Sequence, residues 1–405
     1  MKILRKFQLH LLLKKTIESI NVKNKHVIVR VDFNVPLDDN LQITDDLRIK
    51  SSFPTINYLL ERNAAVILMS HLGRPKGVDD KLRLKPVFEY LKKHMKNKVY
   101  YTTDCIGDEV QKQAKNLKPG EVLLLENLRF HSEEEKNDPN FAKQLASLAE
   151  IYVNDAFGSA HRAHASTEGI AKYLPAVAGF LMIKELDYLI NAVENPKRPF
   201  TAIVGGKKVS DKILVLNRLL DICDNILIGG GMSFTFFKAL GYEIGDSVLD
   251  EKGLDAAKQA MEKAKKLNKQ LLLPVDIVVA DEFSNDADTK SVPADYGIPK
   301  GWQGLDIGFN TIKKFKSVLK ESETILWNGP LGVFELEKFA NGTIQIAQFL
   351  ANSGKTTIIG GGDTASAVEN FGYGDKMTHI STGGGASLEL LEGKVLPGVA
   401  ALNDK

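Results

Sequence analysis

The chain has 405 residues, of which 43% are hydrophobic and 26% charged, with 53 basic against 51 acidic side chains. This length is too great for one ordinary core and predicts two domains of roughly 150–200 residues each. The near balance of charge argues against binding to nucleic acid or to a membrane through the field of the whole protein. The two cysteines, Cys105 and Cys223, are far apart and follow no metal-ligand pattern, so we expect free thiols in a reducing cytoplasm.

The N-terminal segment contains a short apolar run at residues 9–13 that follows basic residues. The run includes His10, precedes Lys14 and Lys15, and lacks a small-residue cleavage site, so it does not fit a signal peptide. No stretch approaches the roughly 20 apolar residues of a membrane span. We interpret residues 1–25 as an amphipathic or partly disordered lead-in to a cytoplasmic protein that binds no membrane.

Short apolar runs alternate along the chain with amphipathic stretches of helical period. In chain order, strands are expected at residues 26–31, 64–70, 98–101, 121–125, 151–153, 200–204, 225–228, 271–273, 277–280, 324–327, 356–359 and 379–381. Helix starts are indicated at Asp138-Pro139 and at Ser210-Asp211. Continuous apolar strands separated by helices are typical of parallel sheets covered on both faces. The sequence therefore predicts an α/β protein with two doubly wound parallel-sheet (Rossmann-like) domains.

The domain boundary is expected at a single helix. Apolar residues recur at helical spacing between residues 183 and 193, and Pro196 and Pro199 end the pattern. We therefore expect a first domain over residues 1–182, a linker helix and hinge over 183–199, and a second domain over 200–392.

Polar side chains follow four strands in the first half of the chain. They are Arg30, Asp32 and Asn34 after the first strand, His71 and Arg74 after the second, and Arg129 and Arg162 after later strands. In open α/β sheets, ligands collect outside the carboxyl ends of the strands. Guanidinium groups bind phosphate and carboxylate oxygens, while Asp and Asn side chains bind hydroxyl groups. Any one of these residues alone is more often a surface residue, but their repetition at strand ends predicts a site for a small anion. His161 and His164 lack partners at metal-ligand spacing, so phosphate contact or structural hydrogen bonding is favoured for them.

Glycine-rich turns follow several strands in the second half. Residues 205–212 follow a strand and open a helix, with Lys212 expected about one turn inside it. Further turns lie at residues 229–231, 360–364 and 382–385, and another loop at 327–335. Glycines let the backbone approach phosphates, and a helix N-terminus offers free N–H groups. These turns predict a nucleotide site.

Asp363 follows one of these turns and is placed to hold Mg²⁺ through oxygen or water, unless it only caps the helix that begins there. The same turn, Gly360-x-Gly362-x-x-Ala365, also matches a dinucleotide fingerprint. That fingerprint requires an acidic residue at the end of the next strand, where Ser381 and Thr382 stand instead.

Seven segments resemble the signature segments of phosphoglycerate kinases, in the family's order. They are residues 29–36, 71–74, 154–164, 205–212, 327–335, 360–364 and 381–391, and the resemblance extends from about residue 26 to the end of the chain. The resemblance implies that 3-phosphoglycerate is bound by Asp32, Asn34, Arg48, His71, Arg74, Arg129 and Arg162. It implies that Mg-ATP or Mg-ADP is surrounded by Lys208, Lys212, Gly304, Gly308, Asn328, Glu335, Gly361, Gly362, Asp363 and Thr364.

The resemblance further implies a phosphoglycerate kinase activity, with Arg48 and Lys212 flanking the phosphoryl group during in-line transfer. It implies a monomer whose C-terminal tail, residues 393–405, packs back on the first domain. The substrate carboxylate is ionised at pH 7, so no general base is required and catalysis depends on alignment and on cations. Two alternatives are a nicotinamide-dependent dehydrogenase built on the Gly360 turn and a non-catalytic nucleotide or anion sensor on the same fold.

Overall fold

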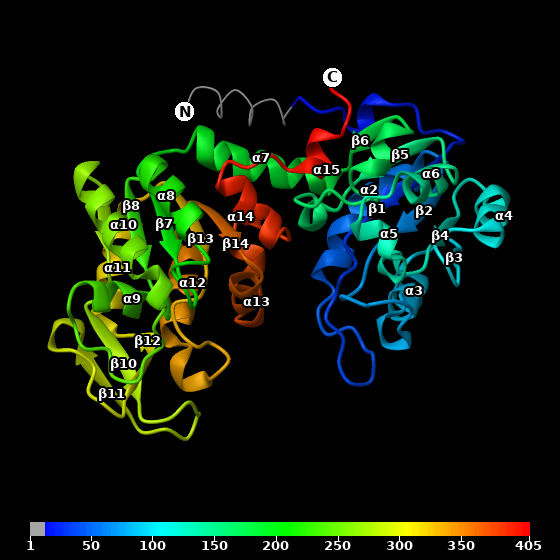
Figure 1. Cartoon of the computed structure of the whole chain (residues 1–405). Coiled ribbons are helices and arrows are strands. Elements are labelled where there is room, and N and C mark those ends of the chain that lie inside the picture. Colours follow the sequence, from blue (N-terminus) through cyan, green and yellow to red (C-terminus); the bar gives the residue numbers. More distant parts are fainter. Residues whose placement is uncertain (1–12) are drawn as a thin grey trace. The chain divides into compact units, whose positions relative to one another are not determined.

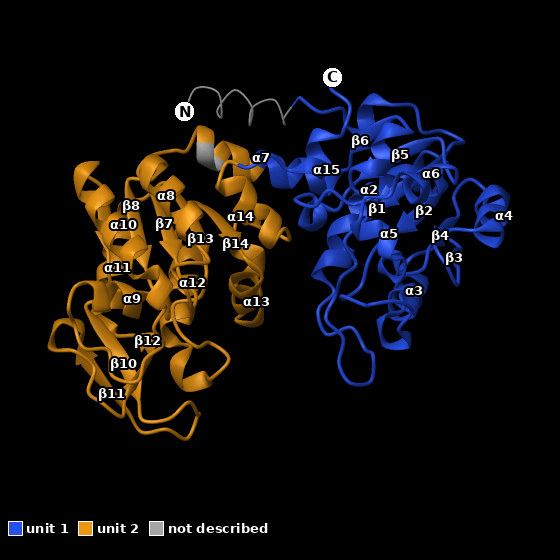
Figure 2. Cartoon of the chain, in the orientation of Figure 1, with its two compact units in different colours: residues 1–187, 394–405 blue, residues 188–393 orange. Residues whose placement is uncertain are grey.

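The computed structural model describes residues 13–405, apart from the side chains of residues 192 and 193. The chain forms two compact units, shown in the two colours of Figure 2: unit 1 comprises residues 1–187 and 394–405, and unit 2 comprises residues 188–393. The point of division lies inside helix α7 (Phe180–Glu194), within the segment for which a linker helix was predicted.

Unit 1 is built on a six-stranded parallel sheet of order β3-β4-β2-β1-β5-β6 (Figure 1). Its strands are β1 (His26–Arg30), β2 (Ala65–Met69), β3 (Val99–Tyr101), β4 (Val122–Leu124), β5 (Ile151–Asn154) and β6 (Ala176–Ala178). Its helices are α2 (Leu47–Glu61), α3 (Lys85–His94), α4 (Asp108–Asn116), α5 (Ser132–Glu135), α6 (Pro139–Ala146) and α15 (Pro397–Ala400). Every residue of β2 and β5 is buried, as expected for parallel strands with both faces covered.

Helix α6 shows how a local signal sets an element of unit 1. The Asp138 carboxylate accepts hydrogen bonds of 2.9 Å from the backbone N–H groups of Asn140 and Phe141, and Pro139 occupies the first turn. Both features satisfy or remove N–H groups that lack partners at a helix start. The predicted start at Asp138-Pro139 is confirmed. Strand β6 was not predicted, because a three-residue Ala-Val-Ala run carries little strand signal.

The C-terminal tail and the described part of the N-terminal segment pack together in unit 1. Asn403 exchanges hydrogen bonds with Ala176 of β6, and the Asn154 side chain donates to Gly398 O at 3.0 Å. The buried Lys14 ammonium donates to Leu402 O at 2.8 Å and pairs with Asp404 at 2.7 Å. The partly disordered alternative for the lead-in is therefore wrong for residues 13–25, and residues 1–12 lie outside the described part.

Unit 2 contains a second six-stranded parallel sheet, of order β15-β14-β13-β7-β8-β9. Its strands are β7 (Phe200–Val204), β8 (Asn225–Ile228), β9 (Gln270–Leu272), β13 (Thr324–Asn328), β14 (Thr356–Gly360) and β15 (His379–Ile380). Its helices are α8 (Ile213–Ile222), α9 (Met232–Ala239), α10 (Leu254–Lys266), α11 (Phe309–Glu321), α12 (Asn341–Ala351), α13 (Gly362–Asn370) and α14 (Gly385–Leu391). Strands β7 and β13 are buried throughout. The predicted fold class is confirmed by the two parallel sheets.

Unit 2 also contains a three-stranded antiparallel sheet of order β11-β10-β12. Its strands are β10 (Asp276–Ala280), β11 (Thr289–Pro293) and β12 (Gln303–Ile307). The expectation that the strand at 277–280 belongs to a parallel sheet was wrong. Only residues 273–275 separate β9 from β10, which is too few for the crossover that a parallel neighbour needs. Strand β11 was missed because most of its side chains are exposed and polar.

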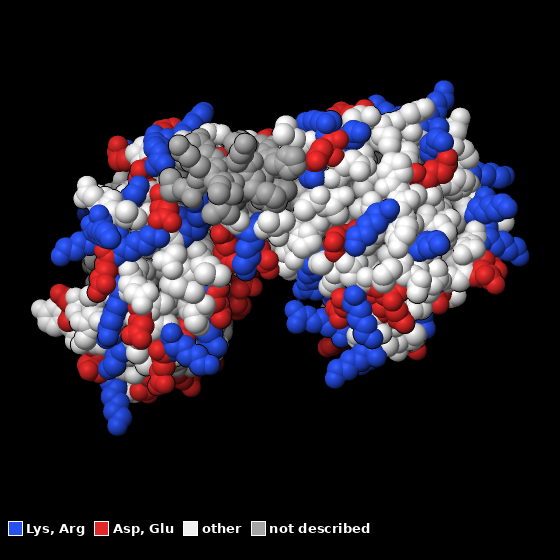
Figure 3. All heavy atoms as spheres, turned by 45° about the horizontal axis from the view of Figure 1, so that its top comes forward, with Lys and Arg blue, Asp and Glu red and all other residues white. Residues whose placement is uncertain are grey.

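On the face shown in Figure 3, basic and acidic side chains are interspersed on both units, in agreement with the balanced composition. Within residues 13–405, no helix has the length and apolar character needed to cross a membrane.

Candidate functional site

The predicted anion-binding residues follow four adjacent central strands of unit 1. In the order β4-β2-β1-β5, these strands lead into the segments that carry Arg129, His71 with Arg74, Asp32 with Asn34, and Arg162. All four strands are parallel, so their carboxyl ends meet at one edge of the sheet. The topology therefore brings these side chains to one edge.

His71 lies at the centre of this group and is buried. Arg30 Nη2 lies 3.0 Å from His71 Nδ1. A guanidinium can only donate, so Nδ1 accepts and the neutral imidazole carries its proton on Nε2. Burial lowers the pKa of His71 well below its usual range, and the charges of Arg30, Arg129, Arg162 and Arg48 lower it further. His71 is therefore a neutral donor among four cations.

Two of these arginines are held in different ways. Arg129 is 6% exposed, and its Nη1 donates to Gly73 O at 2.6 Å. Its Nε lies 3.2 Å from Glu135 Oε1, without the alignment of a hydrogen bond. Burial and the neighbouring Arg162 lower the pKa of Arg129 to about 10, so it stays charged at pH 7. Arg162 is partly buried, and its Nε donates to His161 Nε2 at 3.3 Å.

The remaining predicted residues of unit 1 surround the same edge. Arg48 stands in the first turn of α2, and its Nη1 donates to Asp32 Oδ2 at 2.9 Å. The Asn34 Oδ1 atom accepts from Gly73 N–H at 2.8 Å, which joins the segments that follow β1 and β2. Arg74 is exposed. The unit thus presents several guanidinium groups with one neutral imidazole donor, an arrangement suited to an anion with several oxygens.

Buried residues behind this group support it, and of these only Arg30 was among the residues predicted from the sequence. Arg30 Nε donates to Ser166 Oγ at 2.9 Å, and Ser166 donates to the buried Glu134 carboxylate through both its N–H and its hydroxyl group. Burial raises the pKa of Glu134 and lowers that of His164 to about 3. The 3.8 Å approach of His164 to Glu134 is therefore not an ion pair at pH 7. The sequence feature that could have indicated these buried partners is Arg30 itself, because a charged residue at the end of an apolar strand needs polar partners.

In unit 2, the predicted glycine-rich turns follow five adjacent strands, β15-β14-β13-β7-β8. The turns after β7 and β13 pass so close together that a Cβ on Gly205 would lie 2.1 Å from Pro330 O. Lys212 lies between the same strand ends. Its Nζ donates to Gly205 O at 2.8 Å, to Asn328 O at 3.0 Å and to Asn328 Oδ1 at 2.6 Å. Burial lowers the pKa of Lys212 to about 8, against the opposing effect of Asp363.

Asn328 offers a donor that is not used by the protein. Because the Lys212 ammonium can only donate, Oδ1 of Asn328 faces it and Nδ2 faces the other way. In the part of the chain that the structure describes, this buried Nδ2 has no hydrogen-bond partner. It lies beside Gly360 and Gly361, at the start of α13. A buried donor without a partner next to a glycine-rich helix start is suited to a phosphate oxygen.

The segment 361–364 forms the first turn of α13. The N-cap residue is Gly361, which has a φ of 87°, so the alternative that Asp363 is the helix cap does not hold. Among the described residues, no atom lies within 4 Å of where a Cβ on Gly362 would stand, and Asp363 is exposed. The buried Thr364 hydroxyl accepts from Gly329 N–H at 2.7 Å and joins this turn to the loop after β13.

A cavity of about 670 Å³ opens next to these turns in unit 2. Its apolar part includes Phe234, Ile277 and Leu305, and its polar part includes the backbone of Gly206 and Gly230. Gly304, Glu335 and Asp363 line it, whereas the other predicted nucleotide residues do not. An apolar pocket with glycine turns at its side is suited to a nucleotide base followed by phosphates.

Gly304 and Gly308 differ in what their lack of a side chain allows. A Cβ on Gly304 would lie 2.3 Å from the Phe234 ring, which faces the same cavity. A Cβ on Gly308 would lie 2.3 Å from the Asp276 carboxylate, which accepts from Asn310 N–H and Thr311 N–H at the start of α11. Gly308 thus makes room for a helix cap. Lys208 is exposed.

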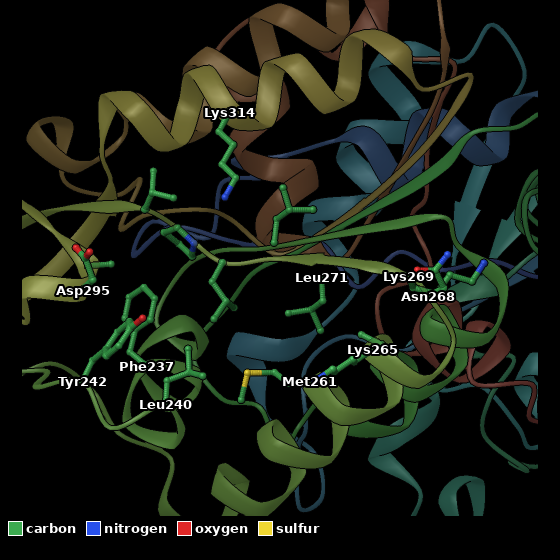
Figure 4. A pocket seen from close by; sticks show the side chains of 16 residues that line it. Phe237, Leu240, Tyr242, Met261, Lys265, Asn268, Lys269, Leu271, Asp295 and Lys314 are labelled. Carbon is green, nitrogen blue, oxygen red and sulfur yellow. The ribbon is translucent and has the colours of Figure 1, made fainter.

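Another cavity of unit 2, of about 770 Å³, is shown in Figure 4. In that view Lys314 reaches into it from α11 and Met261 faces it from α10, with Phe237 and Tyr242 at one side. No residue predicted from the sequence to bind a ligand lines this cavity. Its size alone therefore does not make it the candidate site.

Comparison with known proteins decides the family. A model of the family described as phosphoglycerate kinase matches residues 17–394. The chain belongs to the phosphoglycerate kinase family. It is 60% identical over 393 residues to the cytosolic phosphoglycerate kinase 3 of Arabidopsis thaliana, covering 96% of this chain and 98% of that protein. The cytosolic phosphoglycerate kinase of Nicotiana tabacum is also 60% identical, over 398 residues, with 96% and 99% covered.

Solved phosphoglycerate kinases have the same fold. The enzyme of Coxiella burnetii superimposes with a TM-score of 0.85 at 42% identity, covering 96% of this chain and 98% of that one. The enzyme of Pyrococcus horikoshii gives a TM-score of 0.84 at 33% identity, with the same coverage. The resemblance inferred from the seven sequence segments is confirmed, and the dehydrogenase alternative is wrong.

The placement of Lys212 in this phosphoglycerate kinase family member differs from the prediction. Helix α8 begins at Ile213, and Lys212 is its N-cap residue instead of lying one turn inside. The predicted start at Ser210-Asp211 was wrong because Ser210 N–H donates to the Asp250 side chain at 2.7 Å, which holds the preceding turn outside the helix. Because the helix begins only at Ile213, the Lys212 ammonium stays at the strand ends.

Proposed function

We propose that this protein is a phosphotransferase that catalyses the reversible transfer of the γ-phosphoryl group of ATP to the carboxylate of 3-phosphoglycerate. The products are ADP and 1,3-bisphosphoglycerate, and the reaction belongs to glycolysis and gluconeogenesis. The observation that carries the proposal is 60% identity, over 96% of the chain, to cytosolic phosphoglycerate kinases. The grouped arginines of unit 1 and the glycine-lined cavity of unit 2 support it, since each suits one of the two substrates.

Unit 1 is the proposed binding unit for 3-phosphoglycerate. We assign the non-reacting phosphate to Arg129, Arg162 and Arg74, with the Nε2–H group of neutral His71 as a further donor. Asp32 and Asn34 are assigned to the hydroxyl group, because their oxygens can accept from it. Arg48, paired at 2.9 Å with Asp32, is assigned to the reacting end of the substrate. Four positive charges near His71 explain why a doubly charged phosphate would be bound here.

Unit 2 is the proposed nucleotide unit. Gly304 and Glu335 line the cavity assigned to the base and sugar. Gly308 and Lys208 do not line it and are assigned to the nucleotide by the family resemblance alone. Asn328, Gly361, Gly362 and Thr364 surround the position assigned to the phosphates. The unpartnered Nδ2 of Asn328 supports a phosphate oxygen at this point.

Asp363 fits the role of a magnesium ligand. It is an exposed carboxylate in the first turn of α13, beside an open glycine, and Mg²⁺ prefers oxygen ligands shared with phosphate. When bound, Mg²⁺ would neutralise charge on the nucleotide phosphates. The negative charge of Asp363 also acts on the Lys212 ammonium, since it opposes the lowering of that residue's pKa by burial.

The residues of this chain would catalyse transfer by position and charge. The substrate carboxylate is already ionised, so no side chain must remove a proton before in-line attack. Lys212 is protonated at neutral pH, and its ammonium lies at the strand ends. There it would neutralise charge on the transferring group. Arg48 would do the same from unit 1. His71 and the Arg30–Ser166–Glu134 chain would hold the acceptor in position.

The two substrates are assigned to different units, whereas transfer requires reacting atoms roughly 3–3.5 Å apart. We therefore infer that the units close on each other when both substrates are bound, and that residues 183–199 contain the hinge. Closure would also exclude water, which protects the phosphoryl group from hydrolysis.

We further assign the protein to the cytosol and to a monomeric state without a nucleic-acid or membrane partner. The cytosolic relatives support the location, although a chloroplastic phosphoglycerate kinase of Arabidopsis thaliana is also 60% identical. Size-exclusion chromatography with light scattering tests the monomer, for which a mass near 44.7 kDa is expected.

A coupled assay tests the function. The purified protein is mixed with Mg-ATP and 3-phosphoglycerate, and 1,3-bisphosphoglycerate is followed by NADH oxidation through its reducing dehydrogenase. We expect turnover only when both substrates are present. Binding of both substrates without turnover would identify the non-catalytic sensor and contradict the proposal.

A further inference from the structure

Three residues of unit 1 bring metal-ligating atoms together away from the proposed substrate residues. Ligand atoms of Asp104, Cys105 and His131 all lie within 4.8 Å of one another. Asp104 and Cys105 come from the loop after β3, and His131 follows the short helix at Leu128–Phe130. The 26-residue separation between Cys105 and His131 hid this grouping in the sequence.

The loop that carries two of these residues is held in place. Asp104 O accepts from the Thr102 hydroxyl at 2.5 Å, and Asp104 Oδ1 accepts from Cys105 N–H at 2.6 Å. The His131 Nε2 atom lies 2.6 Å from the same Oδ1 atom. Cys105 is buried, whereas the side chains of Asp104 and His131 are 50% and 27% exposed. The group therefore has one fixed, buried sulfur and two ligands that can rotate at the surface.

We propose that Asp104, Cys105 and His131 form a binding site for a divalent transition-metal ion of the zinc class. Thiolate, imidazole and carboxylate are its usual ligands, and three of them with one water complete a tetrahedral site. Ligand atoms around such an ion lie roughly 3.3–3.8 Å apart. Side-chain rotations that move the ligand atoms of Asp104 and His131 by about 1 Å would therefore suffice. Binding displaces the thiol proton of Cys105 to solvent and replaces the His131–Asp104 hydrogen bond.

The site is connected to a residue assigned to 3-phosphoglycerate. His131 follows Arg129 by two positions, and Asn127 Oδ1 accepts from Arg129 N–H at 3.1 Å. Glu126 N–H donates to Asp104 O at 3.4 Å, while its carboxylate accepts from Asn127 N–H at 2.7 Å. A metal would thus restrain the segment 126–131. Resting on the proposed function of Arg129, we expect the KM for 3-phosphoglycerate to change several-fold and the KM for ATP to stay the same.

Cobalt(II) binding tests the site itself. The metal alone is titrated into the wild-type protein, Cys105→Ser, His131→Gln and the control Cys223→Ser. The Cys223 thiol is also buried but belongs to no such group among residues 13–405. We expect a thiolate-to-cobalt charge-transfer band, saturating at one equivalent, in the wild type and Cys223→Ser. The band should be absent in Cys105→Ser. The affinity should fall in His131→Gln by at least roughly 10–100-fold, which is the cost of removing only a hydrogen-bond partner of a ligand. No band in the wild type, a band retained in Cys105→Ser, or one lost in Cys223→Ser overturns the proposal.

Thermal unfolding of each variant shows whether it is folded. If Cys105→Ser does not fold, His131→Gln still tests the site. Zinc(II) is then added to the coupled assay. A cobalt band combined with an unchanged KM for 3-phosphoglycerate overturns the connection to Arg129. Failure of the proposed function is distinct from both results, since activity is then absent with and without the metal.

Discussion

Replacing Lys212 by Met tests the assignment of the catalytic charge. The substitution keeps an unbranched apolar side chain and removes only the ammonium group. In the free protein that ammonium donates three hydrogen bonds, at 2.8, 3.0 and 2.6 Å, to oxygens of Gly205 and Asn328. It is therefore fixed in position before any substrate binds, which is the condition for strong stabilisation of a transition state.

The size of the effect follows from this arrangement. With a pKa of about 8, Lys212 is roughly 90% protonated at pH 7. Loss of one preorganised group that stabilises charge costs roughly 2.7–4 kcal/mol in the transition state, so we expect kcat to fall about 10²–10³-fold. The KM values for ATP and 3-phosphoglycerate should change only a few-fold, because the ammonium already has protein partners in the ground state.

The coupled assay gives both parameters under saturating and limiting substrate. Lys314→Met is the matched control, since Lys314 is an exposed lysine of the same unit and lines the other cavity. Thermal unfolding of both variants checks the fold. A Lys212→Met protein with near-normal kcat and only a raised KM for ATP would refute the catalytic role and assign the residue to ground-state binding.

Three further predictions concern binding, pH and stability. Arg129→Ala should weaken 3-phosphoglycerate binding, measured by calorimetry, about 10–150-fold, because a hydrogen bond to a charged group is worth roughly 1.5–3 kcal/mol. Unchanged affinity for this ligand with altered nucleotide affinity would contradict the assignment. The kcat/KM for ATP should fall as pH rises through about 8, since Lys212 then loses its proton. By pH 9 only about a tenth of the Lys212 side chains remain charged. A flat profile to pH 9.5 would show that this charge is not needed. Burial raises the pKa of Asp306 from 3.8 to about 7, so its stabilising contribution is present at low pH and is lost as pH rises through about 7. The melting temperature of the wild type relative to Asp306→Asn should therefore decrease between pH 4 and 7, and a constant difference would contradict the buried, protonated carboxyl group.

The edge of each sheet where the candidate residues gather could be predicted from the sequence. Strands with continuous apolar residues and helices between them must run parallel, and parallel strands end at a common edge. The positions of Asp32, His71 and Arg129 after three such strands follow from this rule alone. The same holds for the glycine turn at Gly361, which follows β14.

Other features depend on contacts that leave no local pattern. Arg30 reaches Ser166 across 136 residues, and nothing near either residue indicates the pair. The start of α8 was misplaced because Asp250, 40 residues away, holds Ser210 in a turn. Strands β10 to β12 form an antiparallel sheet whose exposed outer strand is polar. Only the three-residue link between β9 and β10 could have indicated it.

We propose that each unit holds one substrate and that transfer occurs when the units bring the two substrates together. Small-angle X-ray scattering on four samples tests it most directly: the free protein, the protein with nucleotide alone, with 3-phosphoglycerate alone, and in an unreactive ternary complex. We expect the smallest radius of gyration in the ternary complex. The same radius in all four samples, in a protein that shows full turnover, would contradict the claim.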